Sequence, residues 1–241
     1  MTRAVVASDV PLRNRGGEPS MNDTEMAVLL VAGVGSRLRP LTDDRPKALV
    51  ELEGETILAR ALRLLVARGV QEIVLATGFP EDRFFHAALA RGVQEIVLAT
   101  AYREDPIRAA IAGVPARVTL CPNLDYETTQ NSVSLLLCRE ALRNKSFFKP
   151  DGDVVFDPAV LDRLARCSAE LAVAVDSQRV LDAEAMKIRT ENGTIREFGK
   201  ALPIERAGAE TIGIERLAAA AGAPVFDEIV RNRARQSDSK R

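Results

Sequence analysis

Aromatic residues and cysteine are scarce in this chain, and neither sign of charge dominates. Tryptophan is absent from the 241 residues, and the three cysteines are Cys121, Cys138 and Cys167. Three cysteines scattered along the sequence are too few for a disulfide framework or a zinc site. The formal net charge is −1, whereas a surface that binds nucleic acid usually shows a basic excess. We therefore expect a protein without a nucleic-acid partner.

Long apolar runs are also absent. No stretch reaches the roughly 20 residues of a membrane-spanning helix, and residues 5–7 are too short for the apolar segment of a signal peptide. We expect a cytoplasmic protein without a membrane partner, and the length suits one α/β domain. Residues 1–25 lack periodicity and are predicted to be a mobile tail, with Met21 or Met26 as alternative starts, and residues 231–241 to be a polar tail.

The stretch from residue 26 to residue 47 predicts an anion site. Met26 to Val31 is an apolar run typical of a buried strand. Gly33 and Gly35 then permit a tight turn in which backbone N–H groups point at an anion. Positive charge surrounds that turn, from Arg37, Arg39, Arg45 and Lys47. A strand, a glycine turn and several cations together are typical of a triphosphate site.

Two familiar phosphate motifs are excluded by the spacing. The dinucleotide fingerprint requires a third glycine where this chain has Leu38, and Pro40 interrupts the helix that should begin there. The P-loop requires Gly-Lys-Ser/Thr after four intervening residues, and that sequence is missing. An ordinary strand-to-loop turn with surface arginines is the non-functional alternative.

The stretch instead resembles the signature of the nucleotidyltransferases that activate sugar phosphates and choline phosphate. That signature reads Leu-Ala-Ala-Gly-x-Gly-Ser/Thr-Arg-Leu/Met-x-Pro-Leu-Thr, followed after a short gap by Pro-Lys. This chain matches nearly all of it, with Val31 in place of the first alanine. The resemblance implies an α/β protein with a three-layer α/β/α Rossmann-like (GT-A-like) fold and a mostly parallel mixed sheet, formed by residues 26–230.

Patterns after the signature agree with that fold. Apolar residues at helical spacing predict a helix over residues 57–68, capped by Thr56 and ended by Gly69, and Ile73 to Ala76 predicts a buried strand. Strand, helix and strand in this order give parallel pairing through a right-handed crossover. Further strands are predicted at residues 114–121, 154–156 and 171–175, a helix at 133–142, and a hairpin around Glu191-Asn-Gly193.

Eleven residues occur twice without a change. Residues 67–77 reappear letter for letter as residues 90–100, at a spacing of 23 residues. We interpret this repeat as a tandem duplication of one strand–helix unit within residues 67–112. The extra strand either joins an edge of the sheet or is forced out as a loop or helix pair, and the sequence does not decide between them. His86, the single histidine, lies in the first copy and is predicted to be a helix-face residue rather than a base.

The resemblance assigns roles at the nucleotide side of the site. Arg37 and the glycine turn would hold the leaving pyrophosphate, Lys47 would bridge the phosphates, and Asp153 would hold Mg²⁺; these three are the expected catalytic residues. The segment around Gln130 and Asn131 resembles one that lies beside the base and ribose in cytidylyltransferases, although a plain capped helix start is the alternative. The expected nucleotide-binding set is Val31, Ala32, Gly33, Gly35, Ser36, Arg37, Lys47, Gln130 and Asn131.

The resemblance also places the second substrate. Lys187 and Lys200 would face the phosphate of the acceptor, and Asp176 and Glu210 would face its head group. Ordinary solvated charge on a hairpin explains each of these residues equally well.

The implied reaction is attack by a phosphate or phosphonate oxygen on the α-phosphorus of an NTP, with CTP favoured over other nucleotides. A small amino-alcohol phosphate or aminoethylphosphonate is the favoured acceptor, and a sugar 1-phosphate is the alternative. The family usually continues with a strand carrying Trp-x-Glu-Ile-Asp, whose aspartate is a second metal ligand, and this chain has no such segment. A catalytically impaired relative that only binds nucleotide is therefore the competing hypothesis, and the sequence leaves the oligomeric state open.

Overall fold

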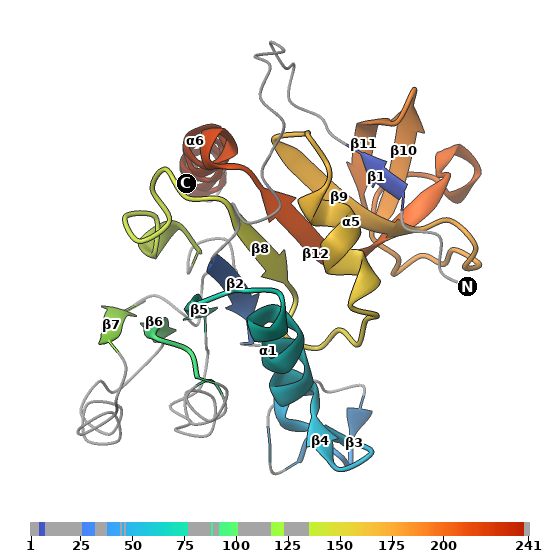
Figure 1. Cartoon of the computed structure of the whole chain (residues 1–241). Coiled ribbons are helices and arrows are strands. Elements are labelled where there is room, and N and C mark those ends of the chain that lie inside the picture. The colour runs from blue at the N-terminus through green and yellow to red at the C-terminus, as the bar shows by residue number, and fades with distance from the viewer. Residues whose placement is uncertain are drawn as a thin grey trace.

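The computed structural model describes residues 5–7, 26–31, 38–43, 45, 47–76, 88, 92–100, 117–122 and 135–238. The described strands are β1 (Val5–Ala7), β2 (Met26–Leu30), β3 (Glu51–Leu52), β4 (Glu55–Thr56), β5 (Glu72–Ala76), β6 (Glu95–Thr100), β7 (Arg117–Pro122), β8 (Phe147–Pro150), β9 (Leu171–Asp176), β10 (Lys187–Glu191), β11 (Thr194–Gly199) and β12 (Ala209–Leu217) (Figure 1). The helices are α1 (Ile57–Ala67), α5 (Ala159–Ala165) and α6 (Gly222–Asp238), with 3₁₀ turns η2 (Lys47–Leu49), η3 (Ile204–Arg206) and η4 (Ala219–Ala221). None of these helices combines the length and hydropathy needed to cross a membrane.

One large mixed sheet organises the chain. Its strand order is β1-β9-β12-β8-β2-β5-β6-β7, and the β10–β11 hairpin joins it through β12. The five strands from β8 to β7 are all parallel, whereas β12 runs antiparallel to β8 and β9. β9 therefore runs in the same direction as β8 and β2, so the carboxyl ends of these three strands share one edge.

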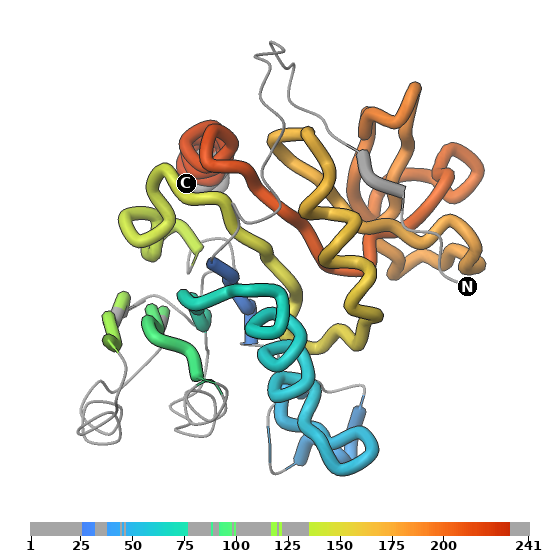
Figure 2. The backbone as a smooth tube through the Cα atoms, in the orientation of Figure 1, coloured from blue at the N-terminus to red at the C-terminus, as the bar shows by residue number. Residues whose placement is uncertain are grey.

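Apolar side chains cover both faces of the sheet. On one face α1 and α5 pack with Leu29 and Phe148 into a buried core. On the other face Met26 and Phe147 pack against residues 135–142 and α6. In Figure 2, α1 and α5 lie together while α6 lies apart from them. These two cores confirm the predicted three layers, because alternate residues of β2 and β8 are buried on opposite faces.

Local signals placed α1 correctly. The Thr56 hydroxyl accepts a hydrogen bond from the amide of Ala59 at 3.1 Å, which satisfies one of the free N–H groups at the helix start. At the other end Gly69 has a φ of +100°, a conformation that favours glycine and stops the helix. The turn Asn192–Gly193 also has positive φ at both residues, as a tight hairpin requires.

The strands of the two repeat copies, β5 and β6, are neighbours inside the sheet. β5 and β6 pair in parallel so that each residue faces its own copy, from Glu72 opposite Glu95 to Ala76 opposite Ala99. The two glutamates are like charges, and each has its own cation: Lys145 bonds Glu72, and Arg117 lies 3.8 Å from Glu95. The extra strand is therefore accommodated between β5 and β7 rather than expelled. His86 lies outside the described residues.

Several boundaries differ from the sequence prediction. Residues 154–156 form no strand; the strand here is β8, which ends at Pro150. Within the predicted helix 133–142, residues 135–137 are helical and 138–142 form turns, because the chain must turn back into β8. Two described segments lie within the predicted tails. Residues 5–7 pair with β9, whose outer edge offers free backbone groups. α6 extends through residues 231–238.

Two of the cysteines lie together. The thiol of Cys121 on β7 contacts the buried thiol of Cys138. The hydrogen bond with Cys138 lowers the pKa of Cys121 to about 7, although burial opposes this shift. The same bond, together with burial, raises the pKa of Cys138. Cys121 is therefore the more readily ionised thiol of the pair.

Removal of one repeat should leave the sheet intact. Deletion of residues 78–100 produces the same sequence as deletion of residues 67–89. β7 can then pair with β5 in the register it now keeps with β6, with Arg117 opposite Glu72. We expect cooperative unfolding in urea with an m value lower by about a tenth, since m scales with the surface exposed. Non-cooperative unfolding, followed by circular dichroism, would show that the sheet depends on the second copy.

Candidate active site

The direction in which strands are added to the sheet reverses at β2. After β2 the chain adds β5, β6 and β7 on one side and then returns to place β8 on the other. Connections leave the two strands in opposite directions at such a switch point, which opens a crevice beyond their carboxyl ends. β2 and β8 are parallel, so the ends of both strands meet there. This edge is the expected position of a ligand site.

A cavity occupies that position. Its volume is about 160 Å³, and the residues that line it are Leu30, Val31, Lys47, Ala48, Asp151, Gly152 and Asp153. A pocket for a whole drug-sized ligand is typically about 300–1,000 Å³. As formed by the described residues, the cavity therefore suits phosphate groups rather than a complete nucleotide.

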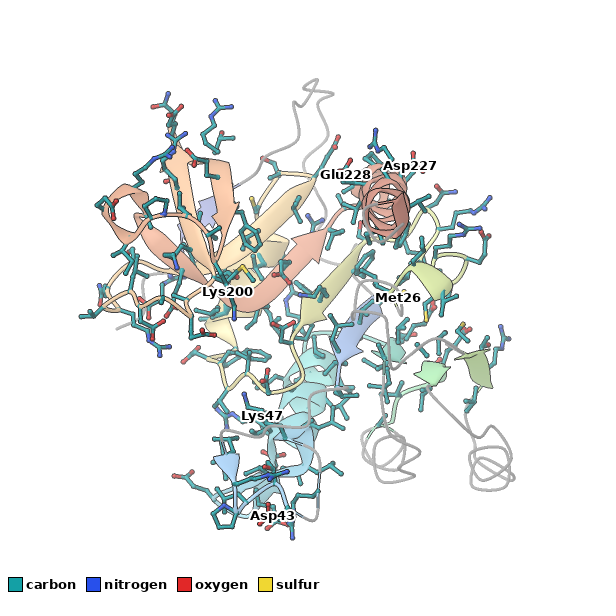
Figure 3. The ribbon with its side chains drawn as sticks, turned by 180° about the vertical axis from the view of Figure 1, so that it is seen from behind. Met26, Asp43, Lys47, Lys200, Asp227 and Glu228 are labelled. Carbon is teal, nitrogen blue, oxygen red and sulfur yellow. The ribbon has the colours of Figure 1, made fainter. Side chains whose placement is uncertain are left out.

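Lys47 and Asp153 form an ion pair across the cavity. The Lys47 ammonium donates a hydrogen bond to Asp153 Oδ2, although the two residues are 106 positions apart. Their side chains are 31% and 38% exposed, so both charges remain accessible to a ligand. Figure 3 shows Lys47 toward the lower end of the sheet, away from Met26 at the start of β2. The structure thus brings together two of the three residues predicted to be catalytic.

Gly152 fixes the position of Asp153. Its amide donates a 3.0 Å hydrogen bond to the carbonyl of Leu30. A Cβ at this position would lie 2.4 Å from Val31 Cγ1 and 2.8 Å from the Leu30 oxygen. No side chain fits in that space, so glycine is required where β8 ends against β2. The glycine before Asp153 therefore has a steric reason.

Comparison with known proteins decides the family. The sequence profile of the MobA-like NTP transferase domain matches residues 27–224. The chain belongs to the MobA-like NTP transferase family. CMP-5'-(3-aminopropyl)phosphonate synthase of Streptomyces rubellomurinus is 38% identical over 148 residues, which are 61% of this chain and 20% of that protein. The bifunctional IPC transferase and DIPP synthase of Rubrobacter xylanophilus is 33% identical over 180 residues, 73% of this chain and 35% of that protein.

This NTP transferase chain spans no more than 35% of the length of these two relatives. A solved structure, the inositol-1-phosphate CTP transferase from T. maritima, aligns with a TM-score of 0.60 and 19% identity, covering 84% of this chain and 74% of that one. At this identity the likeness concerns the fold alone. It confirms the Rossmann-like nucleotidyltransferase architecture predicted from the sequence.

Of the predicted nucleotide-binding residues, Val31 and Lys47 line the cavity. Ala32, Gly33, Gly35, Ser36, Arg37, Gln130 and Asn131 lie outside the described residues. Their assignments remain predictions from the resemblance. Arg39 is described, and its guanidinium lies 3.4 Å from Asp43 on an exposed turn.

A half-buried charge cluster lies beside the cavity, and sequence reasoning missed it. Lys149 on β8 donates to Glu215 on β12 at 2.7 Å and to Asp151 at 3.1 Å. Burial works to lower the pKa of Lys149, but the two carboxylates outweigh it and raise the pKa. Burial also raises the pKa of Glu215, even though Lys149 opposes that shift. A single lysine inside an otherwise apolar strand was the available sequence signal.

β12 connects the cavity to the predicted acceptor residues. Its Gly213 carbonyl accepts a 2.7 Å hydrogen bond from the amide of Asp151, and its Thr211 amide donates a 3.0 Å bond to the carbonyl of Met186. Both attachment points belong to the bulge of β12 between Thr211 and Glu215, in which Gly213 has a φ of +76°. Bulges of this kind are frequent beside active sites.

Register places three of the four predicted acceptor residues in one row. Glu210 lies directly opposite Asp176 on one side and Lys187 on the other. Residues directly opposite in antiparallel strands share a face of the sheet. Lys200 follows β11 and pairs with Glu184 at 2.9 Å. The row lies at the same edge as the cavity, and its role in acceptor binding stays a prediction.

Carboxylates on α6 lie elsewhere. Figure 3 shows Asp227 and Glu228 on that helix, away from Lys47. η4, which precedes α6, is bonded to Ser146 before β8, so the helix starts near the opposite edge of the sheet. These side chains are therefore poor substitutes for a second metal ligand.

Loss of Lys149 from its cluster with Asp151 and Glu215 should destabilise the fold in a pH-dependent way. Lys149→Met leaves Glu215 buried without its cation, which should cost about 3–5 kcal/mol of the free energy of unfolding. Because the folded state raises the pKa of Glu215, it binds the proton more tightly than the unfolded chain does. The free energy of unfolding should therefore fall as pH rises from 5 to 8. Urea denaturation at the two pH values measures this change.

The double variant K149M/E215L is the matched control. It removes both charges, and should recover most of the lost stability. Arg143→Met removes an exposed cation from its pair with Glu140 and should cost less than about 1 kcal/mol. Equal stability of the K149M and K149M/E215L variants would contradict this account of the cluster.

Proposed function

We propose that this chain transfers the cytidylyl group of CTP to a small phosphorylated or phosphonate acceptor that carries an amino group, with release of pyrophosphate. The observation that carries the proposal is the Lys47–Asp153 pair in the cavity at the switch point. The names of the relatives support the choice of cytidine, since they include a CMP-aminopropylphosphonate synthase and a CTP transferase. The proposed location is the cytoplasm.

The chemistry needs no general base. A phosphate or phosphonate oxygen is already an anion at neutral pH, so it can attack the α-phosphorus directly while the bond to pyrophosphate breaks. Catalysis then consists of positioning and charge neutralisation. Lys47 would leave Asp153 and contact the phosphates.

The donor atoms of the cavity fit Mg²⁺. Asp151 and Asp153 both line it, and Mg²⁺ is usually held by one or two carboxylates together with substrate phosphates. Among the described residues no group of three or more metal-ligating side chains occurs, so the phosphates would have to complete the coordination. When bound, the ion would neutralise charge on the α-phosphate. Asp153 is the residue that we propose holds it.

Pyrophosphate release with CTP tests the proposal. The acceptors are phosphocholine, 2-aminoethylphosphonate, inositol 1-phosphate and glucose 1-phosphate, and we expect release with an amino acceptor. Lys47→Ala and Asp153→Asn should each lower kcat by about 100-fold or more, the usual cost of losing one group that stabilises charge. Wild-type rates in either variant would refute the site assignment.

Titration calorimetry separates the two roles. Lys47→Ala should weaken CTP binding with or without Mg²⁺, whereas Asp153→Asn should weaken it only when Mg²⁺ is present. Lys145→Ala, which removes a cation from its pair with Glu72 at the start of β5, is the control and should leave binding unchanged. CTP binding without release on any acceptor would support a nucleotide-binding relative instead, and release with glucose 1-phosphate alone would support a sugar enzyme.

A further inference from the structure

The loop between β9 and β10 is held by all four residues predicted to bind the acceptor. This β9–β10 loop comprises residues 177–186. Asp176 Oδ1 accepts hydrogen bonds from the first residues of the loop, the amides of Gln178 and Arg179, at 2.8 and 3.3 Å. Lys200 pairs with Glu184 further along it. The loop therefore lies against the polar groups that an acceptor would use.

Lys187 is committed to that loop. Its side chain is buried, and its ammonium donates to the carbonyls of Asp182, Ala183 and Ala185 at 3.2–3.3 Å. The carboxylate of Asp182 in turn accepts from the amides of Glu184 and Ala185. Three carbonyl partners satisfy the three donors of an ammonium group. Lys187 thus fixes the second half of the loop, and its ammonium hydrogen bonds go to loop carbonyls rather than to the carboxylate of Glu210.

Glu210 is paired instead with Arg179 in the first half of the loop. The guanidinium Nε lies 3.1 Å from Glu210 Oε1. The Glu210 side chain is 11% exposed, whereas that of Arg179 is 67% exposed. The carboxylate is therefore fixed in the sheet while its cation reaches it from solvent on a long side chain. Among the described residues, Arg179 is the cation that contacts Glu210.

This asymmetry makes the cation the replaceable partner. A buried carboxylate requires a positive charge, but an exposed arginine gains little from supplying it. A ligand with its own ammonium group can occupy the same place and release the guanidinium to water. Asp176, directly opposite Glu210, adds negative charge that favours a cation at this point of the sheet edge.

We propose that Arg179 is a specificity-determining residue that occupies Glu210 until the ammonium group of the acceptor replaces it. This inference rests on the proposed function, because it concerns the acceptor of that reaction. Arg179 competes with every amino acceptor and does not compete with an acceptor that has no amine. The residue therefore sets how strongly the site prefers charged head groups.

Arg179→Gln tests the competition. The probes are 2-aminoethylphosphonate and ethylphosphonate, which share the phosphonate and differ in the amine. In the variant the KM for 2-aminoethylphosphonate should fall about two- to fivefold, the range expected for a partly exposed ion pair, while the KM for ethylphosphonate stays unchanged. A rise of both KM values would show that Arg179 binds the phosphonate, and an unchanged ratio of the two would overturn the proposal.

Two further variants complete the design. Glu210→Gln should raise the KM for the amino acceptor alone. Arg196→Gln removes an exposed cation that lies 3.4 Å from Glu191 at the hairpin, and should leave the ratio unchanged. Titration calorimetry of both phosphonates with CTP present measures the same ratio without turnover. Failure of the proposed function would appear as no release by the native chain, whereas failure of this inference would appear as an unchanged binding ratio.

Discussion

The close approach of Gly152 to the end of β2 is the constraint on which the site depends. Because no Cβ fits there, β8 can end against β2, and the residues on either side of the glycine receive fixed positions. Asp153 reaches Lys47, while Asp151 turns toward β12. A second glycine clears room for it, since a Cβ on Gly213 would lie 2.5 Å from Asp151 Oδ2. Gly152 after β8 therefore makes space for the end of β2, and Gly213 on β12 makes space for the carboxylate of Asp151.

The parts of the site that depend on short sequence patterns were predictable. Lys47 and Asp153 were each assigned from the resemblance to nucleotidyltransferases, and both line the cavity. The strand was predicted at residues 154–156 because Val154 and Val155 have high β propensity. The observed strand β8 contains Lys149, whose charge is paired with Glu215, 66 residues away. The alignment of Asp176 and Lys187 on Glu210 follows from pairing register. Neither the Lys149–Glu215 pair nor this register can be predicted from residues that are close in sequence.

The charges of Lys47 and Asp153 are already paired with each other in the cavity. An anion that binds Lys47 must first break its ion pair with Asp153, and a cation that binds Asp153 must break the same pair. A nucleotide that arrives with its metal offers a partner to each side at once. The half-buried Lys149 pairs with two carboxylates, Asp151 and Glu215, so the local field stays negative and favours such a cation. This arrangement suits an exchange of partners, in which Lys47 and Asp153 leave each other for the phosphates and the metal.

The self-pairing of β5 with β6 shows how a sheet of this type can widen. A strand that is apolar on both faces finds the same surroundings beside its own copy, so repetition creates no mismatch of register or burial. What does not repeat is the charged rim, where Glu72 and Glu95 depend on two unrelated cations. In an evolving gene, duplication of such an interior strand therefore changes the register and burial of the sheet little. What limits the number of copies is a cation for the glutamate at the start of each new strand.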